Sequence, residues 1–190
     1  MARIRFSTAR EVFEAFPAAR ADIEAEPSDD PPQLFVEALL DSPTPEDAIG
    51  FSAYMLPRRE AVWWTCQCLR ALDSMPPAEE GAAIQSAETW VREPEEHRRR
   101  AALEIGERGD NRSPATWAAL AAAWSGGNMM REGQPVQAPP HLTAKAARAA
   151  VLIALARVPA RQRGSQLRAC VEHALSLVRD ETTARPGLQL

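Results

Sequence analysis

Histidine is the residue here with the widest chemical range, because imidazole can transfer a proton or bind a metal near neutral pH. The three histidines, His97, His141 and His173, are far apart in the sequence, and none has a second ligand-type residue at the spacing typical of a zinc site. Glu93 lies four residues before His97, but Pro94 between them predicts a helix start. The sequence therefore predicts a surface position for His97 and no metal site.

Motifs of common nucleotide-binding and hydrolytic sites are absent. The chain contains no G-x-S-x-G, no P-loop and no G-x-G-x-x-G. Gly126–Asn128 has the composition of an anion-binding nest, but a helix stop explains the same residues without a ligand. We predict no catalytic residue and no cofactor. The alternative, an enzyme or small-molecule binder with a site between helices, has His97, Glu93 and Glu96 as its candidates.

The cysteines and the apolar runs bear on where the protein works. Cys66, Cys68 and Cys170 are odd in number, and residues two apart on a helix face different directions, which favours small buried thiols in a reducing compartment. The N-terminus lacks the apolar core of a secretory signal. The longest purely apolar run, Ala149–Ala156, is far shorter than the ~20 residues that span a bilayer. We expect a cytoplasmic protein with no membrane segment.

Charge is unevenly distributed along the chain. The formal net charge is −4, which argues against general affinity for nucleic acid. Residues 21–50 contain only acidic charges, whereas 141–179 is basic except for Glu172. Such a distribution can orient a charged partner, and it also fits two stretches that pack near each other or simply face water. The run Arg98–Arg100 fans around a helix and is interpreted as a solvated face.

One long loop and one basic corner are the candidate partner-binding regions. The loop 126–140 contains methionines that are unusual in a solvated turn, and long loops in compact domains are often functional. The corner between the last two helices gathers arginines suited to an acidic partner. Most tryptophans are expected in the core, but one at a groove edge would anchor a partner. The predicted partner-binding residues are Trp124, Met129, Met130, Arg157, Arg161 and Arg168.

Prolines mark where the helices that position these residues begin. A proline at the first helical position loses no hydrogen bond, and its φ angle already suits a helix. Ser7 or Thr8 followed by Glu11 resembles a capping box that opens a further, N-terminal helix. The prolines that predict helix starts are Pro45, Pro57, Pro77, Pro94, Pro114 and Pro159.

The stretch Pro57–Asp73 predicts the central helix of the domain. Its residues are apolar nearly all round, as expected for a helix buried in the middle of a fold. Trp63 and Trp64 strengthen this prediction, because each indole buries about 150–250 Å². We expect shorter helices to surround this one.

The pattern as a whole predicts an all-α fold, either a single-domain multi-helix bundle or a short array of antiparallel helix pairs. No stretch has the sustained alternation and turn residues of a β-hairpin. The last two helices, 142–158 and 160–179, are expected to form an antiparallel hairpin. The predicted divisions are an N-terminal helix with an acidic Pro-rich linker over 1–32, whose part 17–32 is a loop or mobile linker, a helical domain over 33–179, and a flexible C-terminal tail over 180–190.

Three segments resemble a family of small helical proteobacterial proteins of unknown function, some of them encoded among type VI secretion genes. The resemblance covers about 45–178 and rests on apolar and turn residues. It implies a cytosolic accessory protein, an adaptor or chaperone that helps to load an effector or spike component. The segments are DAIGFSAYMLPRREAVWWTCQCLRAL, SPATWAALAAAWSGGNM and LTAKAARAAVLIALARVP.

The sequence therefore predicts a non-catalytic helical module that binds another protein in a groove between helix pairs. The loop 126–140 and the basic corner are expected to form its binding site. An immunity-type inhibitor of a toxin, using the acidic N-terminal region, is an alternative. The partner is expected to be a protein, not nucleic acid or a membrane, and the oligomeric state is left open.

Overall fold

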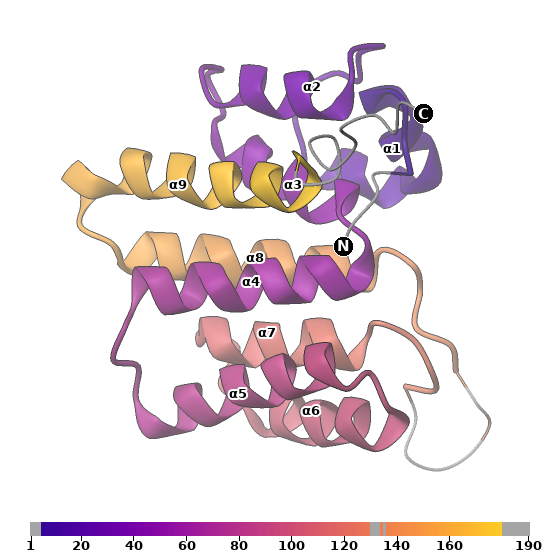
Figure 1. Cartoon of the computed structure of the whole chain (residues 1–190), viewed down its shortest axis with the longest axis vertical. Helices are drawn as coiled ribbons and strands as arrows, with labels where there is room; N and C mark the ends of the chain where they lie inside the picture. The colour runs from indigo at the N-terminus through magenta and orange to yellow at the C-terminus, as the bar shows by residue number, and fades with distance from the viewer. Residues whose placement is uncertain (1–4, 130–133, 135, 180–190) are drawn as a thin grey trace, which may run out of the picture.

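The computed structural model describes residues 5–129, 134 and 136–179, in which helices stack in layers along the long axis (Figure 1). The upper layer holds α1, α2, α3 and α9, the middle layer α4 and α8, and the lower layer α5, α6 and α7. Within these described residues there is no strand beyond an isolated bridge between Asn128 and Gln137, so the all-α prediction is confirmed. The elements are α1 (Ala9–Ala15), the 3₁₀-helix η1 (Pro17–Ala21), α2 (Pro32–Leu39), α3 (Glu46–Met55), α4 (Arg58–Leu72), α5 (Ala78–Arg92), α6 (Glu96–Arg108), α7 (Pro114–Ala123), α8 (Leu142–Arg157) and α9 (Ala160–Arg179).

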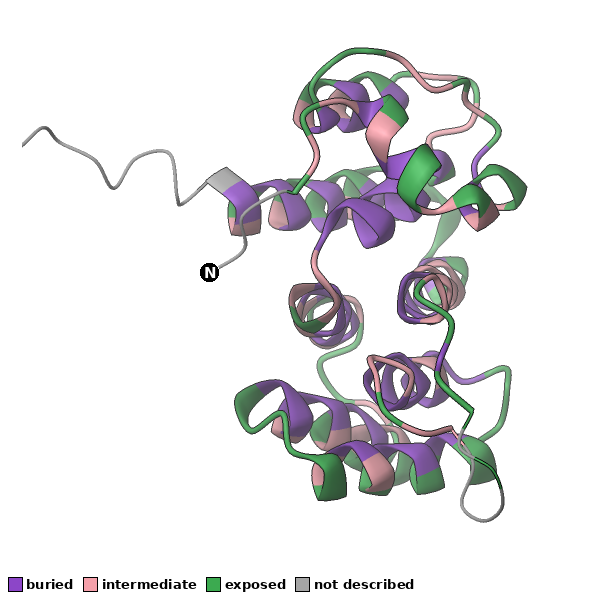
Figure 2. Ribbon diagram, turned by 90° about the vertical axis from the view of Figure 1, so that its right-hand side faces the viewer, coloured by how far each residue is buried: buried purple, intermediate pink, exposed green. Residues whose placement is uncertain are grey.

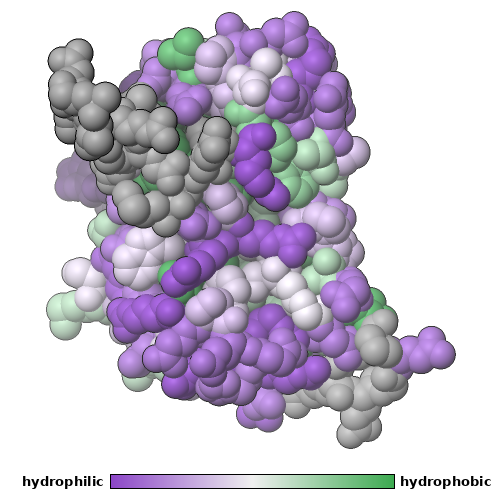
Figure 3. Space-filling model, turned by 45° about the vertical axis from the view of Figure 1, so that its right-hand side comes forward, coloured by the Kyte–Doolittle hydropathy of each residue, from purple (hydrophilic) through white to green (hydrophobic). Residues whose placement is uncertain are grey.

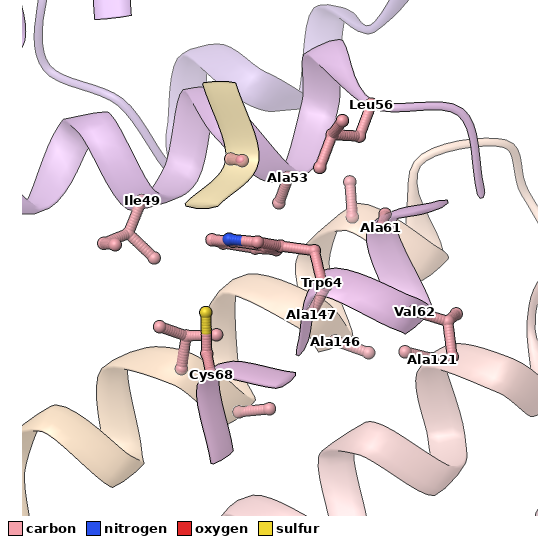
Figure 4. Close-up of a cluster of buried hydrophobic side chains, with 14 of the residues drawn as sticks. Ile49, Ala53, Leu56, Ala61, Val62, Trp64, Cys68, Ala121, Ala146 and Ala147 are labelled. Atoms are coloured by element: carbon pink, nitrogen blue, oxygen red, sulfur yellow. The ribbon is translucent and has the colours of Figure 1, made fainter. Parts of the chain in front are cut away.

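Helix α4 lies in the interior, as predicted. It contacts α3, α5, α7, α8 and α9. The Trp64 side chain is fully buried, and its ring lies between Ile49 and Ala53 of α3 on one side and α8 on the other (Figure 4). Its indole Nε1–H donates to the Cys170 carbonyl of α9 at 2.8 Å. Trp63 is only half-buried, so one of the two adjacent indoles fixes α4 in the core and the other lies at its margin.

Helix α7 shares the interior with α4. Every residue of α7 except Trp117 is buried, and Figure 2 shows buried residues lining the inner sides of the helices around it. Its run of alanines lets α5, α6 and α8 approach closely. On α6, a Cβ added to Gly106 would lie 2.6 Å from Cδ2 of Leu120, so that contact requires glycine. The core is therefore organised around two buried helices, α4 and α7, and not around α4 alone.

The N-terminal helix begins with the predicted capping box. The Thr8 hydroxyl accepts a hydrogen bond from the Glu11 backbone N–H at 3.3 Å. In return, a Glu11 carboxylate oxygen accepts from the Ser7 backbone N–H at 2.6 Å. Two of the amide groups that a helix start leaves without partners are thus satisfied.

The acidic stretch after α1 is a short 3₁₀-helix followed by a loop, and both pack on the body of the protein. Its first residues form η1, and Ile23 is buried in the core. Asp47 of α3 is buried and accepts from the backbone N–H groups of Glu24 and Ala25, each at 3.0 Å. Buried Ala19 and Ile23, the Asp47 carboxylate and the bonds of Asp22 to Tyr54 and Lys145 hold this segment against the body of the protein. The predicted tail 180–190 lies outside the described residues.

Replacement of Asp47 by alanine is expected to release this segment. Two backbone donors and the Thr44 hydroxyl would lose their shared acceptor, at a cost of about 1–3 kcal/mol. Hydrogen exchange should accelerate at the Glu24 and Ala25 amides. Glu46→Ala, an exposed change on the preceding residue, is the matched control. Unchanged exchange in Asp47→Ala would contradict this assignment.

The acidic and basic stretches neutralise each other across the fold. Lys145 of α8 pairs with Asp22 at 2.9 Å, and Arg168 of α9 pairs with Asp41 at 2.8 Å. The uneven charge distribution therefore reflects, in part, two stretches that pack together.

The last two helices reverse direction at a short corner but do not form a simple hairpin. Val158 and Pro159 connect them, and α9 then packs mainly on α3 and α4 instead of along α8 (Figure 1). On α4, the Trp64 indole donates a hydrogen bond to the Cys170 carbonyl of α9. This placement leaves the beginning of α9 beside the ends of α4 and α8.

Candidate partner-binding surface

The predicted basic corner exists, but most of its charge is already paired. Arg157 at the end of α8 forms an ion pair with Glu80 of α5 at 3.0 Å. Arg168 pairs with Asp41, as described above. Arg161 is exposed, and within the described residues it makes neither an ion pair nor a side-chain hydrogen bond. One of the three predicted arginines is therefore available to a partner without first breaking an internal contact.

The predicted partner-binding residues fall at two separate ends of the molecule. Trp124 and Met129 precede α8, whereas Arg157 ends it, and 16 residues of helix at ~1.5 Å each place them ~24 Å apart. Trp124 is half-buried and contacts the Trp117 ring edge-on, with 6.4 Å between ring centroids. Met130 lies outside the described residues. The structure does not combine the loop 126–140 and the basic corner into one compact site.

A buried arginine ties the start of the long loop to the body of the protein. The Arg99 guanidinium donates to the carbonyls of Ala123 at 2.6 Å and Asn128 at 2.8 Å, and it pairs with Glu96 at 2.7 Å. Gly127 has φ of +65°, and a Cβ there would lie 2.7 Å from Nε of Arg99. The interpretation of this arginine run as wholly solvated is wrong at its middle residue, because the long side chain reaches the carbonyl end of α7.

The residues proposed for an enzyme alternative do not converge. His97 is exposed and contacts Glu95 at 3.1 Å. Glu93 pairs with Arg98, and Glu96 pairs with the arginines of its own helix. In the part of the chain that the structure describes, no group of three His, Cys, Asp or Glu side chains is placed to hold a metal ion. No helix there combines the length and apolar character needed to cross a bilayer.

A cavity of about 240 Å³ opens where α4, α5, α8 and α9 meet. Its walls include Leu69, Leu72 and Ile84, and Val158 closes it beside the α8–α9 corner. Arg157, Gln162 and Gln166 add polar groups at α8 and α9. A concave site that combines apolar walls with convergent polar groups is a usual form of binding pocket.

A second hollow of about 530 Å³ adjoins the first. Both are lined by Glu80 and Arg157, so this ion pair stands between them. Arg157 also donates to the Arg112 carbonyl at 3.2 Å, which fixes its guanidinium. We call the two hollows and the Glu80–Arg157 pair the corner surface.

Exposed apolar side chains border the corner surface. Of the four large apolar side chains that the described residues leave exposed, Met75 precedes the cavity-lining Pro76, and Ile105 lines the second hollow. The Met75 side chain is 87% exposed. Apolar groups at the edge of a concave surface are typical of sites that bind another molecule.

The Glu80–Arg157 pair should make stability depend on pH. The Arg157 hydrogen bonds hold the pKa of Glu80 below its ordinary value of 4.5. A carboxyl whose pKa is lowered by folding stabilises the native state fully above 4.5, and this contribution is lost as pH falls through the lowered pKa. The stability difference between wild type and Glu80→Gln is therefore expected to shrink below pH 4.5, measured by urea unfolding. Glu79→Gln, on the exposed neighbouring residue, should show no such loss.

The sequence pattern predicted Arg157 as a partner-binding residue but no other residue of the corner surface. Glu80, Gln162 and Gln166 carry no sequence signal that separates them from ordinary surface positions. The one available signal was Met75 beside a proline pair, where a large apolar residue has no helix face to occupy.

Comparison with known proteins gives one match. The model of a family described as being of unknown function, DUF6931, matches residues 35–178. No curated protein and no solved structure matches the chain. The matched range contains all the residues that line the corner surface.

Proposed function

This chain belongs to the family of unknown function DUF6931, and we propose that it is a non-catalytic module that binds another protein at the corner surface. One observation carries the proposal. An apolar cavity with a polar edge adjoins a second hollow, and exposed apolar side chains border both.

The chemistry of the corner surface favours a partner segment with an apolar anchor. The cavity has room for a large apolar side chain against Leu69, Leu72 and Ile84. Such desolvated pockets ringed by polar groups are where binding energy concentrates in protein interfaces. The amides of Gln162 and Gln166 can donate to and accept from a partner backbone. Arg161 precedes the cavity-lining Gln162 and is exposed, without an ion pair among the described residues, so it can meet a carboxylate of the partner.

The finer role that we propose is that of a cytoplasmic adaptor or chaperone. The resemblance to proteins encoded among type VI secretion genes suggests an effector or a spike component as the partner. A toxin inhibitor that uses the acidic N-terminal stretch is less well supported. Three carboxylates of that stretch, Asp22, Asp41 and Asp47, already bind groups within the chain.

Site-specific photo-crosslinking tests the proposal. A benzophenone amino acid is placed at Met75, beside the cavity, or at Leu34, another exposed apolar position, on α2 in the upper layer. Irradiation in cells of the source organism should give a defined protein adduct from position 75 that is absent from position 34. Arg161→Glu should reduce that adduct. Equal labelling from both positions, or no adduct from position 75, would count against the proposal.

A further inference from the structure

Another concave region lies at the opposite end of α4 and α8 from the corner surface. Here residues before α1 meet the start of α4 and Pro140, two residues before α8. The hollow measures about 570 Å³, and a smaller one adjoins it and shares four of its lining residues. Residues that line the larger hollow include Arg5, Phe6, Phe16, Pro57, Arg58 and Pro140. We call it the N-terminal hollow.

Two arginines give the N-terminal hollow a positive charge that no carboxylate of the described residues offsets. Among those residues, no Asp or Glu lines either of the two adjoining hollows. Among the described residues, neither Arg5 nor Arg58 forms an ion pair, whereas Arg10, Arg70 and Arg157 each have a carboxylate partner. The charge at this end is therefore free to act on a ligand.

The two guanidinium groups are held in different ways. Nη1 of Arg58 donates to the Ser125 carbonyl at 2.8 Å, which fixes the side chain while its other N–H groups stay available. The Arg5 guanidinium lies over the Phe6 ring, 5.7 Å from its centroid. Because a hydrogen bond within the described residues fixes Arg58 but not Arg5, the pair can bind anions of different sizes.

Aromatic rings supply the apolar wall. Phe6 and Phe16 meet edge to face, with 6.2 Å between their centroids, and Phe16 also contacts Tyr54 at 5.6 Å. Phe6 and Phe16 are only partly buried, so part of each ring faces outward. Figure 3, which brings this side of the molecule forward, shows hydrophobic residues beside strongly hydrophilic ones where the upper and middle layers meet.

We propose that the N-terminal hollow binds a small organic anion. Its carboxylate, sulfonate or phosphate group would lie between Arg5 and Arg58, which match such groups with paired N–H donors. Its flat apolar body would pack on Phe6 and Phe16. The charge selects the anion, and the rings select an apolar or aromatic body over a free inorganic ion. This site is separate from the corner surface and does not depend on the proposed function.

A fluorescent anion tests this inference on the full chain. The probe is 8-anilinonaphthalene-1-sulfonate, and its neutral counterpart, N-phenyl-1-naphthylamine, lacks the sulfonate. Wild type should bind the anion saturably, and Arg5→Gln with Arg58→Gln should weaken binding by about tenfold, as loss of charge-assisted hydrogen bonds predicts. The neutral probe should bind wild type more weakly and should not respond to these changes.

Controls separate loss of the site from loss of the fold. Arg92→Gln removes an exposed arginine at the end of α5 and should leave binding unchanged. Arg5→Gln alone, at an exposed position, should weaken binding without lowering the unfolding temperature. Gln162→Trp, which obstructs the corner surface, should have no effect. Equal binding of both probes, wild-type affinity in the double variant, or loss of binding in Gln162→Trp would overturn the inference.

Discussion

Replacement of Trp64 by alanine is expected to lower the free energy of unfolding by about 3–5 kcal/mol, the usual cost of emptying a fully buried aromatic site. The indole is fully buried between α3 and α8, and its loss would also leave the Cys170 carbonyl without its donor. Urea denaturation followed by circular dichroism at neutral pH measures the change.

The neighbouring tryptophan provides the matched control. Trp63 is half-buried, so Trp63→Ala should cost clearly less than the change at Trp64. Trp64→Phe should fall in between, since it keeps most of the packing and loses the hydrogen bond to Cys170. Equal costs at the two positions would contradict the placement of α4.

Replacement of Arg99 by leucine is expected to cost about 3 kcal/mol, because two carbonyls lose a charged donor and each unsatisfied buried polar group costs about 1–3 kcal/mol. The guanidinium is buried and bonds Ala123 at the end of α7 and Asn128 beyond it. Hydrogen exchange should also accelerate at the Met129 amide, whose bond to the Val136 carbonyl closes the loop.

Arg100→Leu is the control for Arg99. Arg100 is on the next position of α6 and pairs with the same glutamate, but its side chain is 37% exposed. An exposed ion pair contributes about 0–1 kcal/mol, so its loss should be small. Arg99→Lys should keep the charge yet lose stability, because an ammonium cannot reach both carbonyls as the planar fork does. Similar stabilities for Arg99→Leu and Arg100→Leu would contradict this assignment.

Features with a local cause were predicted well from the sequence. Pro114 is the first residue of α7, and a proline immediately precedes α3, α4, α5 and α9, whereas Pro94 lies two residues before α6. The Thr8–Glu11 capping box opens α1. The apolar pattern around Trp64 indicated burial, because a helix that is apolar nearly all round must remove its side chains from water. These signals act within a few residues, so a single sequence carries them.

Features that depend on distant contacts were not predictable in the same way. Asp22 and Lys145 are 123 residues apart, and Glu80 and Arg157 are 77 residues apart. Each forms an ion pair in the fold, although nothing in the sequence links the two residues. In the sequence, Arg99 is one member of a basic run. Only the position of α7 beside α6 shows that its side chain is buried and donates to the Ala123 carbonyl. The corner surface combines side chains from several helices, and no local pattern specifies such a combination.

The most direct test of the proposed function is the affinity of the partner captured at Met75 for a chain whose cavity is obstructed. Gln162 is exposed and lines the cavity, so Gln162→Trp should fill its mouth without disturbing the core. Gln85→Trp makes the same change at an exposed position of α5 outside both hollows. We expect binding, measured by titration calorimetry, to weaken about tenfold or more for Gln162→Trp, as loss of an anchor pocket predicts, and to persist for Gln85→Trp. Equal affinity for both variants would contradict the claim that this cavity is where the protein binds its partner.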